Sequence, residues 1–219
     1  MTRVRVDLNV SLDGYAAGEP TADHPMGLDW DRLTAAYAAT RTFRQRVLGD
    51  TGGDGTTGVD DAYAAAYFEG IGAEIMGAAM FGLHSFPDDP DWQGWWGDEP
   101  PFGCPVYVLT HSAPRPEISM PNGTTFRFRS GAIEEILAEA VEAAGGADVR
   151  VGGGVGTARA FLRAGLVDQL HVGIAPILIG GGARLWDDLR GLDRTHQVRS
   201  EVAESGTVHV TFAREAGEA

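Results

Sequence analysis

The chain has 219 residues, 43% of them hydrophobic and 22% charged, proportions that are typical of a globular protein and exclude a disordered or fibrous one. Its formal net charge is −14 and all 17 basic residues are Arg, so an acidic chain without a basic run excludes a nucleic-acid partner. A single cysteine, Cys104, excludes an intrachain disulfide, and no apolar stretch reaches membrane-spanning length, so we expect a soluble, cytoplasmic protein without membrane contact.

The first elements follow from periodicity. Apolar residues occupy every second position from Val4 to Leu12, which predicts a strand that ends at a turn at Gly14. Residues 30–48 are rich in Ala and Arg and predict a helix. The glycine-rich residues 49–58 predict a flexible loop, and residues 60–72 predict a second helix behind it.

The middle of the chain alternates short apolar strands with loops. Residues 73–77, 105–110 and 124–129 predict buried strands. Residues 86–103 carry four prolines and many aspartates, which excludes regular structure and predicts a long loop. Residues 131–144 predict the clearest helix, because their apolar side chains fall on one face and their glutamates largely off it.

The last third predicts a strand–helix–strand unit and then a hairpin. The strands are expected at 148–153 and 168–180 with a helix at 157–165 between them, and the hairpin strands at 196–205 and 207–214. Strands that alternate with helices and finish antiparallel predict a three-layer α/β fold with a mixed sheet. No linker separates two halves, so we expect one domain over residues 1–219.

Four glycines stand within five positions at the junction between the strand at 148–153 and the following helix. Gly152, Gly153, Gly154, Val155, Gly156 and Thr157 form this junction. The first N–H groups of a helix lack intrahelical partners, and glycines let them approach an anion closely, so one interpretation is a pyrophosphate cradle to which Thr157 adds a hydroxyl. The other interpretation is close packing of strand on helix.

The junction differs from two common phosphate motifs. The dinucleotide fingerprint G-x-G-x-x-G would need glycine at Thr157 and belongs to the first strand of its fold, whereas this junction lies two thirds of the way along the chain. A P-loop needs a Lys, and the chain has none. A Rossmann dehydrogenase is therefore disfavoured.

Four segments resemble one family in order along nearly the whole chain. They are NVSLDG near the start, GIGAEIMGAAMFG, PVYVLTHSAPRP, and VRVGGGVGTARAFLRAGLVDQLHVGIAPILIGGGARLW. Together they resemble the dihydrofolate reductase-like proteins, and within them the C-terminal reductase domain of the bifunctional riboflavin-biosynthesis deaminase-reductase. The resemblance implies an α/β/α fold with a mostly parallel sheet and an NADPH-dependent reductase that is commonly a homodimer.

The resemblance also implies roles for individual positions. The glycine junction would hold the cofactor pyrophosphate, and Gly77 would form a second turn on the phosphate side. Thr110, His111 and Ser112 would lie near the adenosine end of the cofactor. Asn9, Ser11 and Asp13 would face the substrate and the nicotinamide.

One departure concerns the choice of cofactor. Relatives usually carry an Arg directly after the glycine that corresponds to Gly77, but this chain has Ala78. A guanidinium there would pair with the ribose 2′-phosphate of NADPH and contribute about 1.5–3 kcal/mol. NADH therefore stays possible beside NADPH, unless Arg115 takes over the contact; otherwise Arg115 is a solvated loop residue.

The cleft chemistry leaves several roles open. Asp13 is the candidate proton donor or substrate anchor, or else a turn aspartate ahead of Gly14. Trp96 is the candidate substrate-binding residue among the aromatic residues of the loop 86–103. These residues either form a lid that stacks on a planar substrate or anchor the loop to the rest of the protein. Arg41 and Arg44 share a helix face and either bind an anion or are solvated.

These observations lead to two hypotheses of function. The first is a nicotinamide-dependent reductase of a C=N, C=C or C=O bond in a small heterocyclic substrate. The second is a non-catalytic ligand-binding protein that keeps the reductase fold. The six histidines show no ligand spacing, so no metal site is expected.

Overall fold

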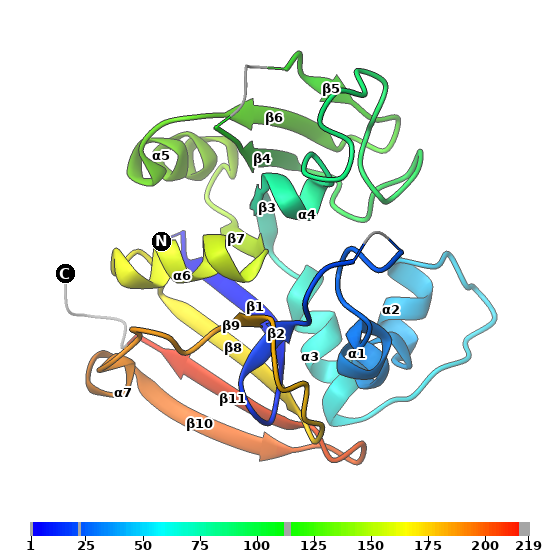
Figure 1. Ribbon diagram of the computed structural model, residues 1–219, viewed down its shortest axis with the longest axis vertical. Coiled ribbons are helices and arrows are strands. Elements are labelled where there is room, and N and C mark those ends of the chain that lie inside the picture. The colour runs from blue at the N-terminus through cyan, green and yellow to red at the C-terminus, as the bar shows by residue number, and fades with distance from the viewer. Residues whose placement is uncertain (1, 22, 112–114, 215–219) are drawn as a thin grey trace. The chain divides into compact units, whose positions relative to one another are not determined.

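The structure is a computed structural model that describes residues 2–21, 23–111 and 115–214 (Figure 1). Tertiary contacts divide the chain into two compact units. The first unit comprises residues 1–6 and 70–167, and the second comprises residues 7–69 and 168–219. Strand β1 (Val4–Ser11) contributes to both units, and the single domain expected from the sequence stays a prediction.

One nine-stranded sheet has the order β10-β11-β8-β1-β7-β3-β4-β6-β5 in the part of the chain that the structure describes. Beside β1, the strands of the first unit are β3 (Ile71–Gly77), β4 (Pro105–Leu109), β5 (Ile118–Ser119), β6 (Thr125–Arg129) and β7 (Asp148–Gly153). Those of the second unit are β8 (Gln169–Ala175), β10 (Gln197–Val202) and β11 (Val208–Ala213).

Strand directions confirm the predicted mixed sheet. The start of β1 pairs parallel with β7, and β7, β3, β4 and β6 follow one another in parallel, whereas β5 is antiparallel. In the second unit β10 and β11 form the expected antiparallel hairpin, and β11 pairs antiparallel with β8. The sheet is therefore mostly parallel with an antiparallel C-terminal hairpin.

The first unit packs helices on both faces of its sheet. The helices are α4 (Ala78–Phe81), α5 (Ile133–Ala143) and α6 (Val155–Arg163). Tyr107 of β4 donates from its hydroxyl to the carbonyl of Glu139 on α5 at 3.2 Å. Its neighbours Val106 and Val108 point to the opposite face, because side chains alternate along a strand. There they pack with Phe81 of α4, so α5 and α4 lie on opposite faces.

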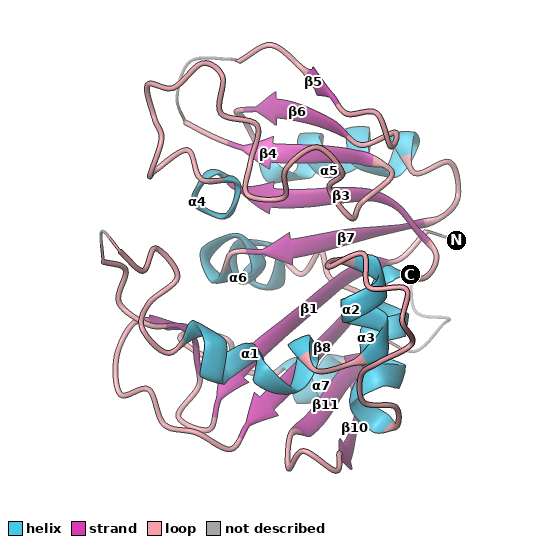
Figure 2. Ribbon diagram, turned by 90° about the vertical axis from the view of Figure 1, so that its right-hand side faces the viewer, coloured by secondary structure: helices cyan, strands magenta, loops and turns pink. Residues whose placement is uncertain are grey.

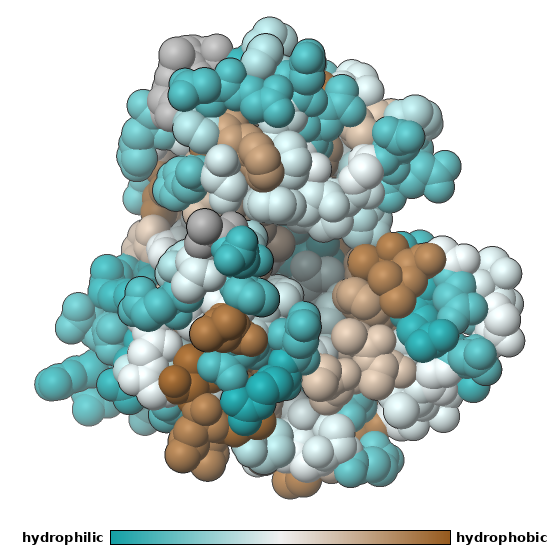
Figure 3. Space-filling view, turned by 45° about the vertical axis from the view of Figure 1, so that its right-hand side comes forward, coloured by the Kyte–Doolittle hydropathy of each residue, from teal (hydrophilic) through white to brown (hydrophobic). Residues whose placement is uncertain are grey.

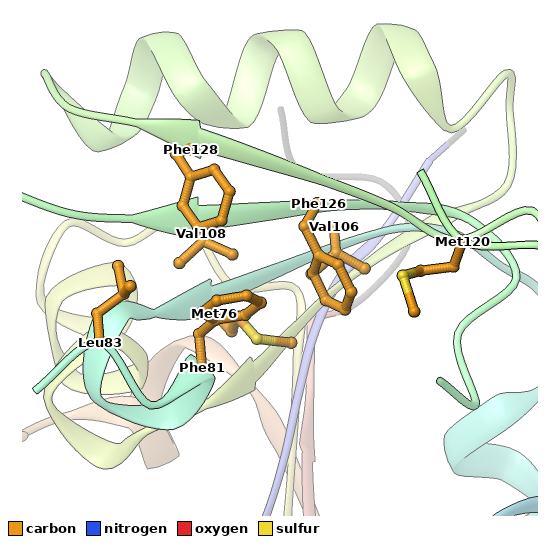
Figure 4. Close-up of a cluster of buried hydrophobic side chains, with 8 residues drawn as sticks. All are labelled: Met76, Phe81, Leu83, Val106, Val108, Met120, Phe126 and Phe128. Atoms are coloured by element: carbon orange, nitrogen blue, oxygen red, sulfur yellow. The ribbon is translucent and has the colours of Figure 1, made fainter. Parts of the chain in front are cut away.

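An apolar cluster forms the core on the α4 face (Figure 4). Phe126 is fully buried at its centre and makes edge-to-face contact with Phe81 at a centroid distance of 5.0 Å. The buried members of the cluster are Met76, Phe81, Leu83, Val106, Val108, Met120, Phe126 and Phe128. They come from β3, α4, β4 and β6 and the loops beside them, and therefore fix these strands to one another.

The second unit contains the remaining helices and a small two-stranded sheet. They are α1 (Trp30–Ala38), α2 (Arg41–Arg46), α3 (Val59–Phe68), α7 (Leu192–Thr195), β2 (Tyr15–Ala17) and β9 (Ala183–Arg184). The prediction of one helix over 30–48 is wrong: Thr40 adopts an extended backbone and its hydroxyl accepts a bond from the Phe43 N–H at 3.1 Å, which starts a new helix.

The strand expected at 168–180 is also shorter, because β8 ends at Ala175. Pro176 follows, and a proline has no backbone N–H with which to continue the ladder.

On the face drawn in Figure 3, apolar side chains gather in a few separate patches among hydrophilic ones. The described residues include no helix that is both long enough and apolar enough to cross a membrane.

Candidate functional site

The candidate cofactor site lies at the carboxyl ends of three neighbouring strands of the first unit. Strands β7, β3 and β4 are adjacent and parallel, so their carboxyl ends meet at one edge of the sheet (Figure 2). Gly153 ends β7, Gly77 ends β3, and Thr110 follows β4. Ligands of open α/β sheets bind at this kind of edge. Three segments that are far apart in the sequence are thus brought to one edge, as the resemblance implies.

The glycine junction presents the amino end of α6. Gly154 is the N-cap residue, and the N–H groups of Val155, Gly156 and Thr157 follow in the first turn. A Cβ atom added at Gly154 or Gly156 would meet no described atom within 4 Å. Open space therefore lies beside these amides. The junction can accept an anionic group where the helix dipole favours it.

Two glycines at this edge are required for a different reason. A Cβ on Gly77 would lie 2.5 Å from Thr157 Oγ1, so the turn after β3 and the first turn of α6 approach each other closely. Gly153 has a φ of 132°, and a Cβ on it would lie 2.9 Å from Met80 Sδ. Close packing therefore describes the junction at Gly153, and the space that a cradle needs is open at Gly154 and Gly156.

The residues expected at the adenosine end follow β4. Thr110 is buried, and its N–H donates to the Arg129 carbonyl at 2.9 Å. His111 is exposed beside it. Ser112 lies outside the described residues.

Two candidate anion-binding arginines have partners within their own units. Arg115 donates to the Asp89 carbonyl and lies over the Phe128 ring at 5.9 Å. Arg44 donates from Nε to Asp50 at 2.9 Å. The hydrogen bond from the Gly52 N–H is the main cause that lowers the pKa of Asp50, and the contact with Arg44 is the second.

Asp13 of the second unit is held as a carboxylate. It accepts bonds from Ser11 Oγ at 2.5 Å, from the Gly180 N–H at 2.7 Å and from the Ile179 N–H at 3.1 Å. The Ser11 hydroxyl and then these amides lower the pKa of Asp13 to about 2. Asp13 therefore carries no proton near neutral pH, which favours the anchor over the donor among its predicted roles.

The other two residues predicted to face the substrate lie on the same strand. Ser11 is buried, and its Oγ also accepts a bond from the Tyr15 N–H at 3.0 Å. Asn9 lies against β8, with Oδ1 only 2.7 Å from the position of a Cβ on Gly173.

The aromatic residues of the loop 86–103 pack on the first unit. Trp96 lies 4.9 Å from the Phe102 ring and stacks at 6.0 Å on Phe126 of the core cluster. The Trp92 indole donates to the Phe81 carbonyl at 2.8 Å. These contacts support the anchoring interpretation of the loop, and substrate binding by Trp96 stays a prediction.

Sequence reasoning missed a buried ion pair directly beneath the glycine junction. Glu74 of β3 and Arg150 of β7 form a hydrogen-bonded ion pair, with side chains 0% and 2% exposed. Glu74 follows Ala73 and precedes Ile75, and Arg150 lies between Val149 and Val151, so each charge has apolar neighbours along its strand, and this was the signal in the sequence. Charged residues are almost never fully buried unless they are paired.

Comparison with known families identifies the chain. A family model described as the RibD C-terminal domain matches residues 2–209. The chain belongs to the RibD C-terminal domain family. No curated protein sequence matches this RibD C-terminal domain.

Solved structures share its fold. A protein ascribed to riboflavin biosynthesis from Shewanella sp. PV-4 is 24% identical with a TM-score of 0.60, over 98% of this chain and 100% of its own. A pyrimidine reductase-like protein from Corynebacterium diphtheriae is 14% identical with a TM-score of 0.50, over 98% and 92%. Dihydrofolate reductase from Enterococcus faecalis, complexed with NADP(H), is 12% identical with a TM-score of 0.48, over 98% of this chain and 97% of its own. The RibD C-terminal domain thus shares its mixed, mostly parallel fold with the protein ascribed to riboflavin biosynthesis, and its family supports an oxidoreductase of the riboflavin-pathway type.

Proposed function

We propose that this RibD C-terminal domain is an NAD(P)H-dependent reductase that transfers a hydride to a C=N, C=C or C=O bond of a small heterocyclic substrate. An intermediate of the riboflavin-pathway type, such as a phosphoribosylamino-uracil, is the substrate class that the family suggests. The observation that carries the proposal is the open space beside Gly154 and Gly156 at the amino end of α6, in a chain of this family.

The residues of the junction fit a dinucleotide pyrophosphate. Backbone N–H groups at the start of α6 would bind its oxygens, and the Thr157 hydroxyl would add a donor. Thr110, His111 and Ser112 would contact the adenosine end, and Gly77 keeps the first turn of α6 within reach of β3. A bound reduced nicotinamide would supply the hydride. The binding geometry is thus assigned to backbone groups more than to charged side chains.

Asn9, Ser11 and Asp13 are proposed to bind the substrate. The Asp13 carboxylate fixes the backbone at Ile179 and Gly180 next to the end of β1. Asp13→Asn is expected to lower turnover far more than cofactor affinity, because it removes an anchor on the substrate side. Turnover that stays unchanged in this variant would remove Asp13 from the site.

The proposed cofactor is NADPH, which the family resemblance implies, and NADH is the alternative, which the residue at position 78 favours. Ala78 offers no cation for a 2′-phosphate, and the Arg115 guanidinium is engaged with Asp89. NADPH preference therefore needs a cation from elsewhere, such as Arg115, to contact the 2′-phosphate, whereas NADH needs none.

We also propose that the protein is a homodimer through its hairpin edge. All six residues of β10 are exposed, and β10 is the edge strand of the sheet. Val198 and Val202 are 48% and 66% exposed, and they point to the same face because they are four residues apart on a strand. A second copy would cover these side chains and the outer edge of β10.

The experiment that tests the reductase is separate titration of the purified protein with NADPH and NADH, followed by nucleotide fluorescence and tryptophan quenching. Saturable binding of either nucleotide supports the reductase and names the cofactor. Binding of neither, with or without candidate pyrimidine substrates, favours the second hypothesis, a ligand-binding protein that keeps the reductase fold.

A further inference from the structure

The ion pair between Glu74 and Arg150 is buried between two neighbouring strands of the sheet. The two residues are directly opposite each other on the parallel strands β3 and β7. Both side chains are buried, with at most 2% of their surface exposed to solvent. Removing two charges from water costs more than their attraction returns unless the geometry is favourable, so buried pairs often stabilise a fold no better than apolar residues of similar volume. Stability alone therefore gives no reason for charges at this position.

The pair borders an irregularity in the sheet. Ile75 pairs with Val151, but the next residue of β3, Met76, pairs with Gly153. Gly152 is thus an extra residue in β7, a β-bulge of the kind that redirects a strand next to a functional site.

The carboxylate of Glu74 fills the space above this bulge. A Cβ on Gly152 would fall against Glu74 Oε1, closer than real Cβ atoms come to any neighbour. Glu74 Oε2 meanwhile accepts a bond from Arg150 Nη2, two residues before Gly152 on the same strand. The side chain of Glu74 therefore takes the place of the side chain that Gly152 lacks, and Arg150 holds it there.

We infer that Glu74 and Arg150 are positioning residues that set the bulge at Gly152 and thereby aim the backbone amides of residues 153–157 at the cofactor pyrophosphate. This inference rests on the proposed function. The path is short, since Gly153 and Gly154 separate the bulge from the first residue of α6. A displacement at Gly152 is carried directly into the amides that would bind the ligand.

The test exchanges the charged pair for apolar residues of similar volume. The double variant Glu74→Met with Arg150→Met keeps the space filled and removes both charges of the pair together, so its Tm is expected to stay near that of the wild type. Its Kd for NADPH is expected to rise about tenfold, within the range over which contacting residues couple. Amide hydrogen exchange of residues 153–157, measured without nucleotide, is expected to become faster.

Gly152→Ala is the second variant, because it displaces the Glu74 carboxylate without removing a charge, and the same rise in Kd is expected. Gly72→Ala is its matched control. A Cβ on Gly72 would lie 2.5 Å from the Ala144 carbonyl oxygen, so this glycine is also crowded. It lies near the start of the neighbouring strand β3, at the opposite end from the glycine junction. The control is expected to lower Tm and to leave the Kd of the folded protein unchanged.

The outcomes separate the inference from the function. If the wild type binds NADPH and both site variants bind it equally well with unchanged exchange, the positioning role is overturned. A rise in Kd for Gly72→Ala equal to that for Gly152→Ala would also overturn it, because the effect would then follow stability. If the wild type binds no nucleotide, the proposed function fails, and hydrogen exchange at residues 153–157 alone decides the inference.

Discussion

Nε2 of His171 lies 2.9 Å from Nδ1 of His209, and both rings are buried in the second unit. A carboxylate follows at each end of the pair. Asp60 lies 2.9 Å from His209 Nε2, and Asp7 lies 3.3 Å from His171 Nδ1. The Tyr63 ring stacks on both imidazoles, at 4.4 Å from His171 and 4.1 Å from His209. A chain of four polar side chains thus ties α3 to strands β1, β8 and β11.

The first prediction concerns the stability of the second unit at acidic pH. Burial, and to a smaller degree the neighbouring His171, lowers the pKa of His209 below its ordinary 6.5, although Asp60 and Glu201 act in the opposite direction. In the unfolded chain, His209 binds a proton at a higher pH than it does in the folded chain. Protonation therefore lowers the free energy of unfolding as pH falls below about 6.5. Urea unfolding between pH 8 and pH 5 measures the slope, and His209→Gln is expected to flatten it. An equal slope in this variant would contradict the assignment.

The second prediction concerns stronger acid. The folded Asp13 keeps its charge down to a pKa of about 2, whereas the unfolded residue is protonated near 3.8. The contribution of this carboxylate is complete above the higher value and is lost as pH falls toward the lower one. Acid unfolding of Asp13→Asn, compared with the wild type from pH 5 to pH 2, is expected to show a smaller pH dependence. The variant isolates this carboxylate because the Asn side chain does not titrate.

The third prediction concerns the core of the first unit. Phe126→Ala removes a fully buried ring that contacts Phe81 and Trp96, so a loss of about 3–5 kcal/mol in the free energy of unfolding is expected. Val141→Ala on the outer side of α5, where the side chain is 37% exposed, is the control and is expected to cost far less. Denaturant unfolding measures both. Similar values for the two variants would show that the cluster does not dominate the unit.

The fourth prediction concerns the Thr157 hydroxyl. Thr157→Ala removes one donor to the proposed pyrophosphate, and a hydrogen bond to a charged group contributes about 1.5–3 kcal/mol, so Kd for the preferred nucleotide is expected to rise by about tenfold or more. Thr157→Ser keeps the hydroxyl and is expected to bind nearly as the wild type does. If both variants bind equally, the hydroxyl serves the contact with Gly77 and not the ligand.

The fifth prediction concerns assembly. Val202→Asp places a charge on the exposed face of β10, where the wild-type side chain is 66% exposed. If two copies meet at this edge, light scattering is expected to give a dimer for the wild type and a monomer for the variant, with little change in Tm. A wild-type monomer would end the proposal, and a dimer that tolerates the Asp would move the interface elsewhere.

Periodicity predicted the long elements, because one face of each is buried. The alternation from Val4 to Leu12 and the apolar face of residues 131–144 correspond to β1 and α5. Periodicity did not predict the break at Thr40. There the side-chain hydroxyl accepts a bond from the Phe43 N–H, in place of the backbone bond that a continuous helix would make. Very short elements such as β5 also escape it, since two residues carry no period.

The candidate site could be predicted where chemistry is local and not where it depends on neighbours. The glycine junction was identified because its residues are contiguous. The partner of Glu74 was not, since Arg150 is 76 residues away and only the register of β3 on β7 places them together. The low pKa of Asp13 likewise depends on Ile179 and Gly180, which no local pattern connects to the first strand.

The sharing of β1 by two units affects how the chain can be made. Val4 to Val6 pair with Val149 to Val151, so 145 further residues follow before the first strand meets this partner. At a synthesis rate of about 5–20 residues per second, that delay on the ribosome is roughly 7–30 s. Because each unit also combines early and late stretches, neither can be expressed as one uninterrupted fragment. Folding of the sheet is therefore expected to finish only after most of the chain has left the exit tunnel.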